Sequence, residues 1–256
     1  MAITNSTERF SSRVANYVLY RPGYPLQMLK VLKDECGLVP NSVIADVGSG
    51  TGFLSKLFLE NGNQVYGIEP NRDMREAGEG ILKAYPKFGS VIGTAEATTL
   101  PRTSVDFVTA GQAAHWFNAA KARCEFLRIL KPGGWLTLAW NDRSTETTPL
   151  LTDYEWLLET YCPEYAEVQR QGVTGVSDVE PFFAPAPVGV KSFSSRQIFD
   201  YEGLKGRLLS ASYVPLEGHP NHEPMLRELR KIFDRHQANG RVALDYETKM
   251  YYGRIA

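Results

Sequence analysis

Residues 43–52 read VIADVGSGTG, an apolar run that leads into three alternating glycines. The apolar run is typical of a strand buried on both faces, and the residues after Gly52 place apolar side chains at helical spacing. Glycine is needed where a backbone turns tightly and where a ligand approaches the chain with no Cβ in the way. The stretch therefore predicts a strand, a ligand-contacting turn and a helix in succession.

The same alternation of strand and helix continues as far as residue 140. The strand-like runs are residues 43–47, 64–69, 90–93, 105–110 and 135–140, with amphipathic segments between them. Strands that alternate with helices over short connections predict an α/β fold, in which a doubly wound parallel sheet is covered on both faces.

The flanks of this core predict helices. Residues 1–38 are interpreted as an N-terminal helical cap, helical from Phe10 to Leu38 around a Pro-Gly break at residues 21–25. Residues 39–145 form the predicted cofactor-binding core, and residues 146–256 the predicted lid insertions and last two strands of the same sheet. Within that last part the expected elements are helices at 149–167, 202–210 and 223–237, a linker at 172–189 and a strand at 242–252.

An acidic residue accompanies the glycine turn. The second strand-like run ends in Glu69, 21 residues after Gly48. In a doubly wound sheet this carboxylate lies beside the turn, where it can accept hydrogen bonds from both hydroxyls of a ribose. A glycine turn alone is a weak signal, but strand, turn, helix and spaced acid together predict a nucleoside site.

The glycine spacing favours one nucleoside over another. Dinucleotide sites use Gly-x-Gly-x-x-Gly, which presents a helix N-terminus to a pyrophosphate. Here the spacing is Gly-x-Gly-x-Gly, preceded by Asp46. A carboxylate repels a pyrophosphate but suits a ligand that carries an ammonium and a sulfonium. The pattern predicts S-adenosylmethionine rather than NAD, with Asp46 either facing that ligand or bracing the turn.

Four segments, in this order, resemble the motifs of the class I S-adenosylmethionine-dependent methyltransferases. Asp46–Gly52 is similar to their first motif and Gly67–Asn71 to their second-strand motif. Gly93–Glu96, followed by Val105–Val108, resembles their adenine loop and fourth strand, and Leu130–Gly134 the turn before their fifth strand. The resemblance implies a Rossmann-like seven-stranded, mostly parallel sheet with a helical lid, and methyl transfer to a small molecule.

The flanking segments resemble the trans-aconitate methyltransferase-like branch of that family. The segments concerned are Tyr17–Pro25, Gln112–Phe117 and Ser210–Val214. This branch label says little about the substrate.

The family resemblance also implies roles for individual residues. Gly48 and Gly50 face the methionine part of the cofactor, and Glu69 holds the ribose. Asn71 and Met74 flank the adenine, and Ala95 presents its backbone N–H to the adenine ring. Many relatives have Asp where this chain has Thr94, so Glu96 or a water takes the adenine amino group. The remaining residues of the predicted cofactor site are Ser49, Gly52, Pro70 and Gln112.

The loop after the fourth strand is expected to carry the catalytic residue, because ligands of such sheets bind beyond the carboxyl ends of the strands. His115 is the only histidine in the core motifs. A histidine near pH 7 serves equally as a general base, as a hydrogen-bonding group for the acceptor or as a residue packed on the lid. His115 is the candidate catalytic residue, and Trp116 and Asn141 are expected to line the same pocket.

A second cluster, Tyr17, Arg21 and Tyr24, lies in the N-terminal segment. Arg21 can fork onto a carboxylate, either that of the cofactor's methionine or that of an acidic substrate. The alternative is a surface arginine beside a proline turn. Tyr213 is expected in the lid over the site.

Composition excludes several other classes. The net charge of −1, with no Lys/Arg-rich run, argues against nucleic-acid and anionic-membrane partners. Three distant cysteines predict neither a disulfide framework nor a Cys-x-x-Cys metal site, and His219 and His222 lack a third ligand nearby. With no secretory signal or membrane span, a cytoplasmic protein is expected.

A nicotinamide-dependent oxidoreductase and a non-catalytic S-adenosylmethionine binder are the alternative functions. The sequence leaves the substrate and the oligomeric state open.

Overall fold

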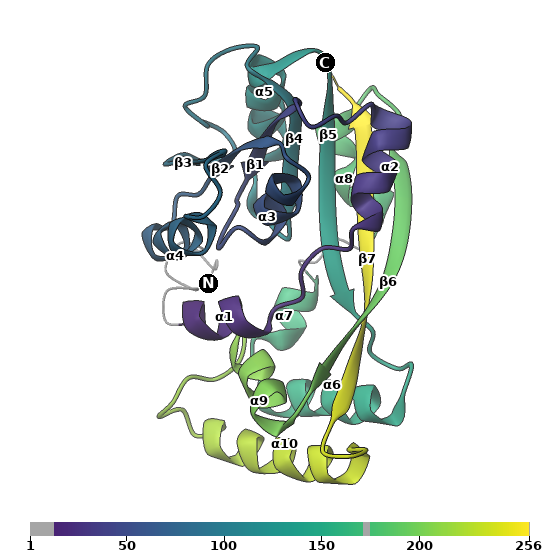
Figure 1. Ribbon diagram of the computed structural model, residues 1–256. Helices are drawn as coiled ribbons and strands as arrows, with labels where there is room; N and C mark the ends of the chain where they lie inside the picture. The colour runs from purple at the N-terminus through teal and green to yellow at the C-terminus, as the bar shows by residue number, and fades with distance from the viewer. Residues whose placement is uncertain (1–12, 171–174, 256) are drawn as a thin grey trace.

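A seven-stranded sheet organises the computed structural model, which describes residues 13–170 and 175–255 (Figure 1). The strand order is β3-β2-β1-β4-β5-β7-β6, with β1 to β5 parallel and β7 antiparallel to both of its neighbours. The strands are β1 Val43–Val47, β2 Gln64–Ile68, β3 Phe88–Val91, β4 Val105–Gly111, β5 Leu130–Arg143, β6 Gly189–Phe199 and β7 Val242–Arg254. The strand order reverses between β1 and β4, which is where such sheets open a ligand crevice.

Helices cover both faces of the sheet. The helices are α1 Val14–Tyr20, α2 Gln27–Cys36, α3 Phe53–Glu60, α4 Arg72–Leu82, α5 Ala119–Ile129, α6 Pro149–Tyr161, α7 Tyr165–Arg170, α8 Val176–Phe183, α9 Tyr201–Leu209 and α10 His222–His236. Apolar residues of α2 and α3 make one core with the sheet, and those of α5 and α8 make another on the opposite face. These two cores fix the ends of the central strands.

A second lobe extends beyond the carboxyl ends of the parallel strands. Helices α6, α7, α9 and α10 share a separate apolar core with the far halves of β6 and β7 (Figure 1). Helix α1 lies between this lobe and the sheet and packs on α9. Gly206 of α9 permits that contact, because a Cβ there would lie 2.0 Å from the ring of Tyr20.

The predicted fold class is confirmed, but several predicted elements are wrong. The expected linker at 172–189 contains α8, and of the two last strands predicted within residues 146–256 only the one at 242–252 was located, so the position of β6 was not predicted. Strand β6 alternates half-buried and exposed side chains at the edge of the sheet, so it lacks a strong apolar pattern. The expected helix at 149–167 is two helices, α6 and α7. The third strand lies at Phe88–Val91 rather than at 90–93, and Phe10 lies outside the described residues.

None of the described helices combines the length and the apolar character that crossing a membrane requires.

Candidate active site

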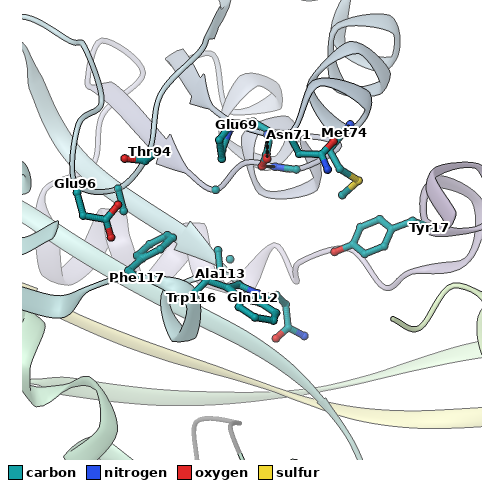
Figure 2. A pocket seen from close by; sticks show the side chains of 15 residues that line it. Tyr17, Glu69, Asn71, Met74, Thr94, Glu96, Gln112, Ala113, Trp116 and Phe117 are labelled. Carbon is teal, nitrogen blue, oxygen red and sulfur yellow. Dashed lines mark hydrogen bonds between the residues drawn. The ribbon is translucent and has the colours of Figure 1, made fainter. Parts of the chain in front are cut away.

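A cavity of about 260 Å³ opens where the carboxyl ends of β1, β2 and β4 meet (Figure 2). Its walls come from the glycine turn, the start of α4, the loop after β3, the loop after β4 and helix α1. The lining residues are Tyr17, Gly48, Gly50, Glu69, Pro70, Asn71, Met74, Thr94, Ala95, Glu96, Gly111, Gln112, Ala113, Trp116 and Phe117.

The glycine turn has the conformation that its sequence predicts. Gly48, Gly50 and Gly52 all have positive φ, between 56° and 86°. The N–H groups of Gly48 and Ser49 both donate to the carbonyl of Ile68 at the end of β2, at 2.8 and 3.1 Å. Gly52 lies away from the cavity, where a Cβ would be 2.5 Å from Leu82 of α4. Gly48 and Gly50 therefore border the cavity, and Gly52 serves helix packing.

Glu69 joins the glycine turn to helix α4. One carboxylate oxygen accepts from the N–H of Gly50 at 2.9 Å, and the other from the N–H of Asn71 at 2.8 Å. The side chain is 8% exposed, and burial raises its pKa although both hydrogen bonds oppose the shift. Each oxygen keeps a second lone pair, so the carboxylate can still accept hydrogen bonds from a ligand.

The far end of the cavity combines apolar walls with backbone groups. The Asn71 side chain caps α4 by accepting from the N–H of Met74 at 3.0 Å. Residues 94–97 form a tight turn that closes with two backbone hydrogen bonds and places buried Ala95 at the wall. Glu96 accepts from the N–H of Asn118 at 2.8 Å, so one of its oxygens is already engaged. Met74, Ala95 and Phe117 supply surfaces that a flat aromatic ring can pack against.

Asp46 is fully buried beneath the glycine turn. Its two oxygens accept from the hydroxyls of Ser55 at 2.6 Å and Thr109 at 3.3 Å. These contacts tie Asp46 to α3 and β4, and Asp46 also borders a second, smaller cavity, so both roles that the sequence left open stay predictions. Burial raises the pKa of the Asp46 carboxyl to about 6, against the opposing effect of both hydroxyls.

This second cavity continues the first toward helix α1. The two share Tyr17, Gly48, Gly50, Gly111 and Gln112. Beyond these, the smaller cavity is lined by Arg21, Pro22, Tyr24, Asp46, Ser49, Thr51, Phe53, Leu54 and Asn141. The side-chain amide of Asn141 donates to the carbonyl of Gly23 at 3.2 Å, which ties the N-terminal segment to β5.

The absence of a side chain at Gly111 leaves room for the ring of Tyr24. A Cβ on Gly111 would lie 2.2 Å from the Tyr24 hydroxyl oxygen, so the phenol packs directly over the end of β4. Tyr17 points its hydroxyl into the main cavity from α1 (Figure 2). The predicted residues Tyr17, Arg21, Tyr24, Trp116 and Asn141 thus all border one of the two cavities.

Three predicted site residues lie outside the walls of both cavities: Gly52, which packs on α4, His115 and Tyr213. His115 sits in a 3-10 turn, Ala114–Trp116, with an exposed side chain that packs on Trp116. Desolvation by neighbouring groups lowers the pKa of its imidazole to about 4, so the ring is neutral at pH 7 and weakly basic. Tyr213 packs against Tyr165 in the second lobe. The general-base role of His115 stays a prediction.

Sequence reasoning missed several wall residues. Ala113 and Phe117 were not predicted, although the adjacent residues Gln112 and Trp116 were predicted site residues. Gly111 has no side chain that could have marked it as a functional residue. The histidines of the 219–222 loop serve structure: buried His222 places Nδ1 2.9 Å from the carbonyl of Pro215. Across the ranges 13–170 and 175–255, His, Cys, Asp and Glu nowhere gather in a group of three that could hold a metal ion.

The Asp46 carboxyl predicts a pH dependence. Its folded pKa of about 6 is above the unfolded value, so the folded state holds the extra proton between about pH 4 and 6. Stability should therefore fall as pH rises through that window, by on the order of 3 kcal/mol at most. Asp46→Asn should remove this part of the pH profile, as measured by urea unfolding at pH 4.5 and 7. An unchanged profile in the Asn variant would assign the titration to other groups.

The fold and the site together define a doubly wound α/β protein with a cavity at the switch point of its sheet. Known proteins narrow this class further. A family model described as a methyltransferase domain matches residues 45–138. An uncharacterized methyltransferase from Schizosaccharomyces pombe is 27% identical over 250 residues, which cover 94% of this chain and 95% of the relative.

Solved structures agree on the fold. A provisionally named type II methyltransferase from Anaeromyxobacter dehalogenans has a TM-score of 0.67 at 21% identity, over 92% of this chain and 98% of that chain. Phosphoethanolamine N-methyltransferase 2 from Haemonchus contortus, solved with S-adenosyl-L-methionine, has a TM-score of 0.53 at 13% identity, over 98% of this chain and 58% of that one. The chain therefore carries a methyltransferase domain at residues 45–138 and has the fold of the class I S-adenosylmethionine-dependent methyltransferases. Its placement in the trans-aconitate methyltransferase-like branch stays a prediction.

Proposed function

We propose that this protein binds S-adenosylmethionine in the main cavity and transfers its methyl group to a small molecule that enters beside α1. The proposal rests mainly on the position of Glu69 at the cavity wall. Its two carboxylate oxygens accept hydrogen bonds from the glycine turn and from the start of α4. A carboxylate fixed there by two backbone N–H groups is oriented to accept hydrogen bonds from a pair of vicinal hydroxyls.

The lining residues fit the proposed cofactor along its whole length. Met74, Ala95 and Phe117 provide the apolar walls for the adenine, with Glu96 near its amino group. Gly48 and Gly50 provide close backbone approach for the methionine part, and Asp46 beneath them supplies negative potential for an ammonium. Ser49, Pro70, Asn71 and Gln112 complete the proposed cofactor site, and Gly52 supports it through packing on α4.

The bound cofactor supplies an activated methyl group on a sulfonium, and this chain supplies alignment and exclusion of water. Alignment alone can contribute about 7–11 kcal/mol to such a displacement. In this proposal Tyr17, Arg21, Tyr24, Trp116 and Asn141 form the acceptor side, because they border the cavities next to the glycine turn. His115 and Tyr213 line neither cavity, although Tyr213 lies near Arg21.

The proposal also assigns roles to three parts of the chain. Residues 39–145 bind the cofactor, residues 1–38 cap the site, and residues 146–256 supply the lid and the last two strands. Support comes from α1, which carries Tyr17 into the main cavity and packs on α9 of the second lobe.

A labelled-methyl assay tests the proposed activity. A small-molecule extract is incubated with the protein and with S-adenosylmethionine that carries a ¹³C methyl group, and mass spectrometry follows the products. The expected result is at least one product heavier by one labelled methyl, absent with the Glu69→Ala variant. Label found only in macromolecules would contradict the small-molecule proposal.

A further inference from the structure

Three arginines, from the segment after α1, from α9 and from β5, lie near the same tyrosine, Tyr213. Arg21 follows α1, Arg207 lies in α9, and Arg143 ends β5. Each guanidinium group lies over a different tyrosine ring: Arg21 is 5.1 Å from the ring centre of Tyr17, Arg143 4.8 Å from that of Tyr154 and Arg207 5.7 Å from that of Tyr246. We call Arg21, Arg143 and Arg207 the arginine cluster.

Within the described residues, only one member of the arginine cluster has a carboxylate partner. Arg143 pairs with Glu155, which lies in α6. Over residues 13–170 and 175–255, no carboxylate oxygen lies within 4.0 Å of a nitrogen of Arg21 or Arg207. Arg21 donates to the carbonyl of Ser210 at 3.2 Å and Arg207 to the hydroxyl of Tyr246 at 3.0 Å. The charge of these two arginines is therefore left unpaired by carboxylates.

Burial makes the unpaired charge costly. Arg207 is 6% exposed, and the Nε–H of Arg21 is buried without an acceptor. Burial, followed by repulsion from Arg207, lowers the pKa of Arg21. Cation–π contacts and single neutral acceptors compensate a buried guanidinium less well than an anion does. The guanidinium groups of Arg21 and Arg207 are therefore suited to bind an oxyanion that a ligand provides.

The position of Arg21 connects this pair to the cofactor cavity. Arg21 lines the smaller cavity together with Asp46 and Gly50, and Tyr17 lines both cavities. A molecule whose anionic group reaches Arg21 therefore lies next to the glycine turn. Guanidinium groups match the planar, bidentate geometry of carboxylate and phosphate oxygens.

We propose that Arg21 and Arg207 bind the oxyanion of the methyl acceptor, so that the substrate is a small carboxylate or phosphate ester. The identification of this anion as the methyl acceptor rests on the proposed function. Binding of an oxyanion by Arg21 and Arg207 does not depend on methyl transfer. Arg143 is not part of the anion site, because Glu155 already neutralises it.

Thermal unfolding of the ligand-free protein tests the unpaired charge. Arg21→Met and Arg207→Met each remove a cation that has no carboxylate partner, so the melting temperature should rise or stay within about 2 °C. Arg143→Met is the matched control, because it leaves Glu155 unpaired and should lower the melting temperature by several degrees. Equal losses in all three variants would contradict the inference.

Anion binding is then measured by thermal shift at constant ionic strength. The probes are succinate and glycerol phosphate, each paired with its uncharged counterpart, butanediol and glycerol. At least one anion should raise the melting temperature of the wild type, the uncharged compounds should not, and Arg207→Met should lose the shift. The anion with the larger shift distinguishes a carboxylate substrate from a phosphate ester.

Saturating S-adenosylhomocysteine separates the acceptor site from a site for the methionine carboxylate. The anion shift should persist with S-adenosylhomocysteine present, because the acceptor occupies separate space. Loss of the shift would assign the arginines to the cofactor and overturn the inference. An anion no better than chloride, or a shift retained in Arg207→Met, would also overturn it. Absence of S-adenosylhomocysteine binding, with the anion shift intact, would contradict only the proposed function.

Discussion

Replacing Glu69 by alanine is expected to weaken the binding of S-adenosylhomocysteine tenfold or more. The substitution removes the carboxylate proposed to accept from both ribose hydroxyls, and charge-assisted hydrogen bonds contribute about 1.5–3 kcal/mol each. The substitution also leaves the N–H groups of Gly50 and Asn71 without the carboxylate acceptor that Glu69 provides. Isothermal titration calorimetry on folded variants measures the effect.

Glu76→Ala is the control for Glu69→Ala. Glu76 is an exposed carboxylate on α4 whose partner is Arg72 of the same helix. Its loss should leave S-adenosylhomocysteine affinity unchanged and stability nearly so, because exposed i,i+4 pairs contribute little. Full affinity in a folded Glu69→Ala variant would show that the ribose binds elsewhere.

Removing residues 1–24 is expected to abolish methyl transfer while leaving a folded core that still binds S-adenosylhomocysteine. The deletion takes away Tyr17 of the main cavity, Arg21 and Tyr24 of the smaller one, and the backbone that Asn141 holds. A displacement at a sulfonium needs an aligned site from which water is excluded. Cofactor affinity should fall by less than tenfold, since the glycine turn, α4 and the 94–97 turn all remain.

A point substitution tests the same contact without truncation. Gly206→Leu places side-chain atoms where the Tyr20 ring now packs and should displace α1 from α9, so turnover should fall far more than S-adenosylhomocysteine affinity. Gly80→Leu is the matched control, because a Cβ at this exposed glycine of α4 meets nothing within 4 Å. Wild-type turnover by Gly206→Leu or by the truncated protein would contradict the proposed cap.

The sequence predicted the part of the molecule in which local pattern and chemistry coincide. Strand, glycine turn and Glu69 follow one another along about 30 residues, so their spacing alone places them together. The position of strand β6 was not predicted, because its Ser, Lys, Arg and Gln residues are typical of a polar loop. Its pairing with β7, some 50 residues later, provides the hydrogen bonds that make it a strand.

Long-range packing decides the residues that the sequence could not place. Gly111 is a wall residue because Tyr24, far away in the chain, packs over it. Arg207 shows no motif, and its importance follows only from burial beside Arg21 and from the absence of a carboxylate partner within the described ranges. His115 shows the opposite case: its residue type suggested catalysis, but the 3-10 turn leaves its side chain exposed.

The central claim is that the cavity between the glycine turn and Glu69 holds S-adenosylmethionine rather than a dinucleotide. Calorimetric titration of the wild-type protein with S-adenosylhomocysteine, and separately with NAD, tests this most directly. We expect saturable heat with one S-adenosylhomocysteine per chain and no heat with NAD. Binding of NAD, with no heat from S-adenosylhomocysteine, would contradict it.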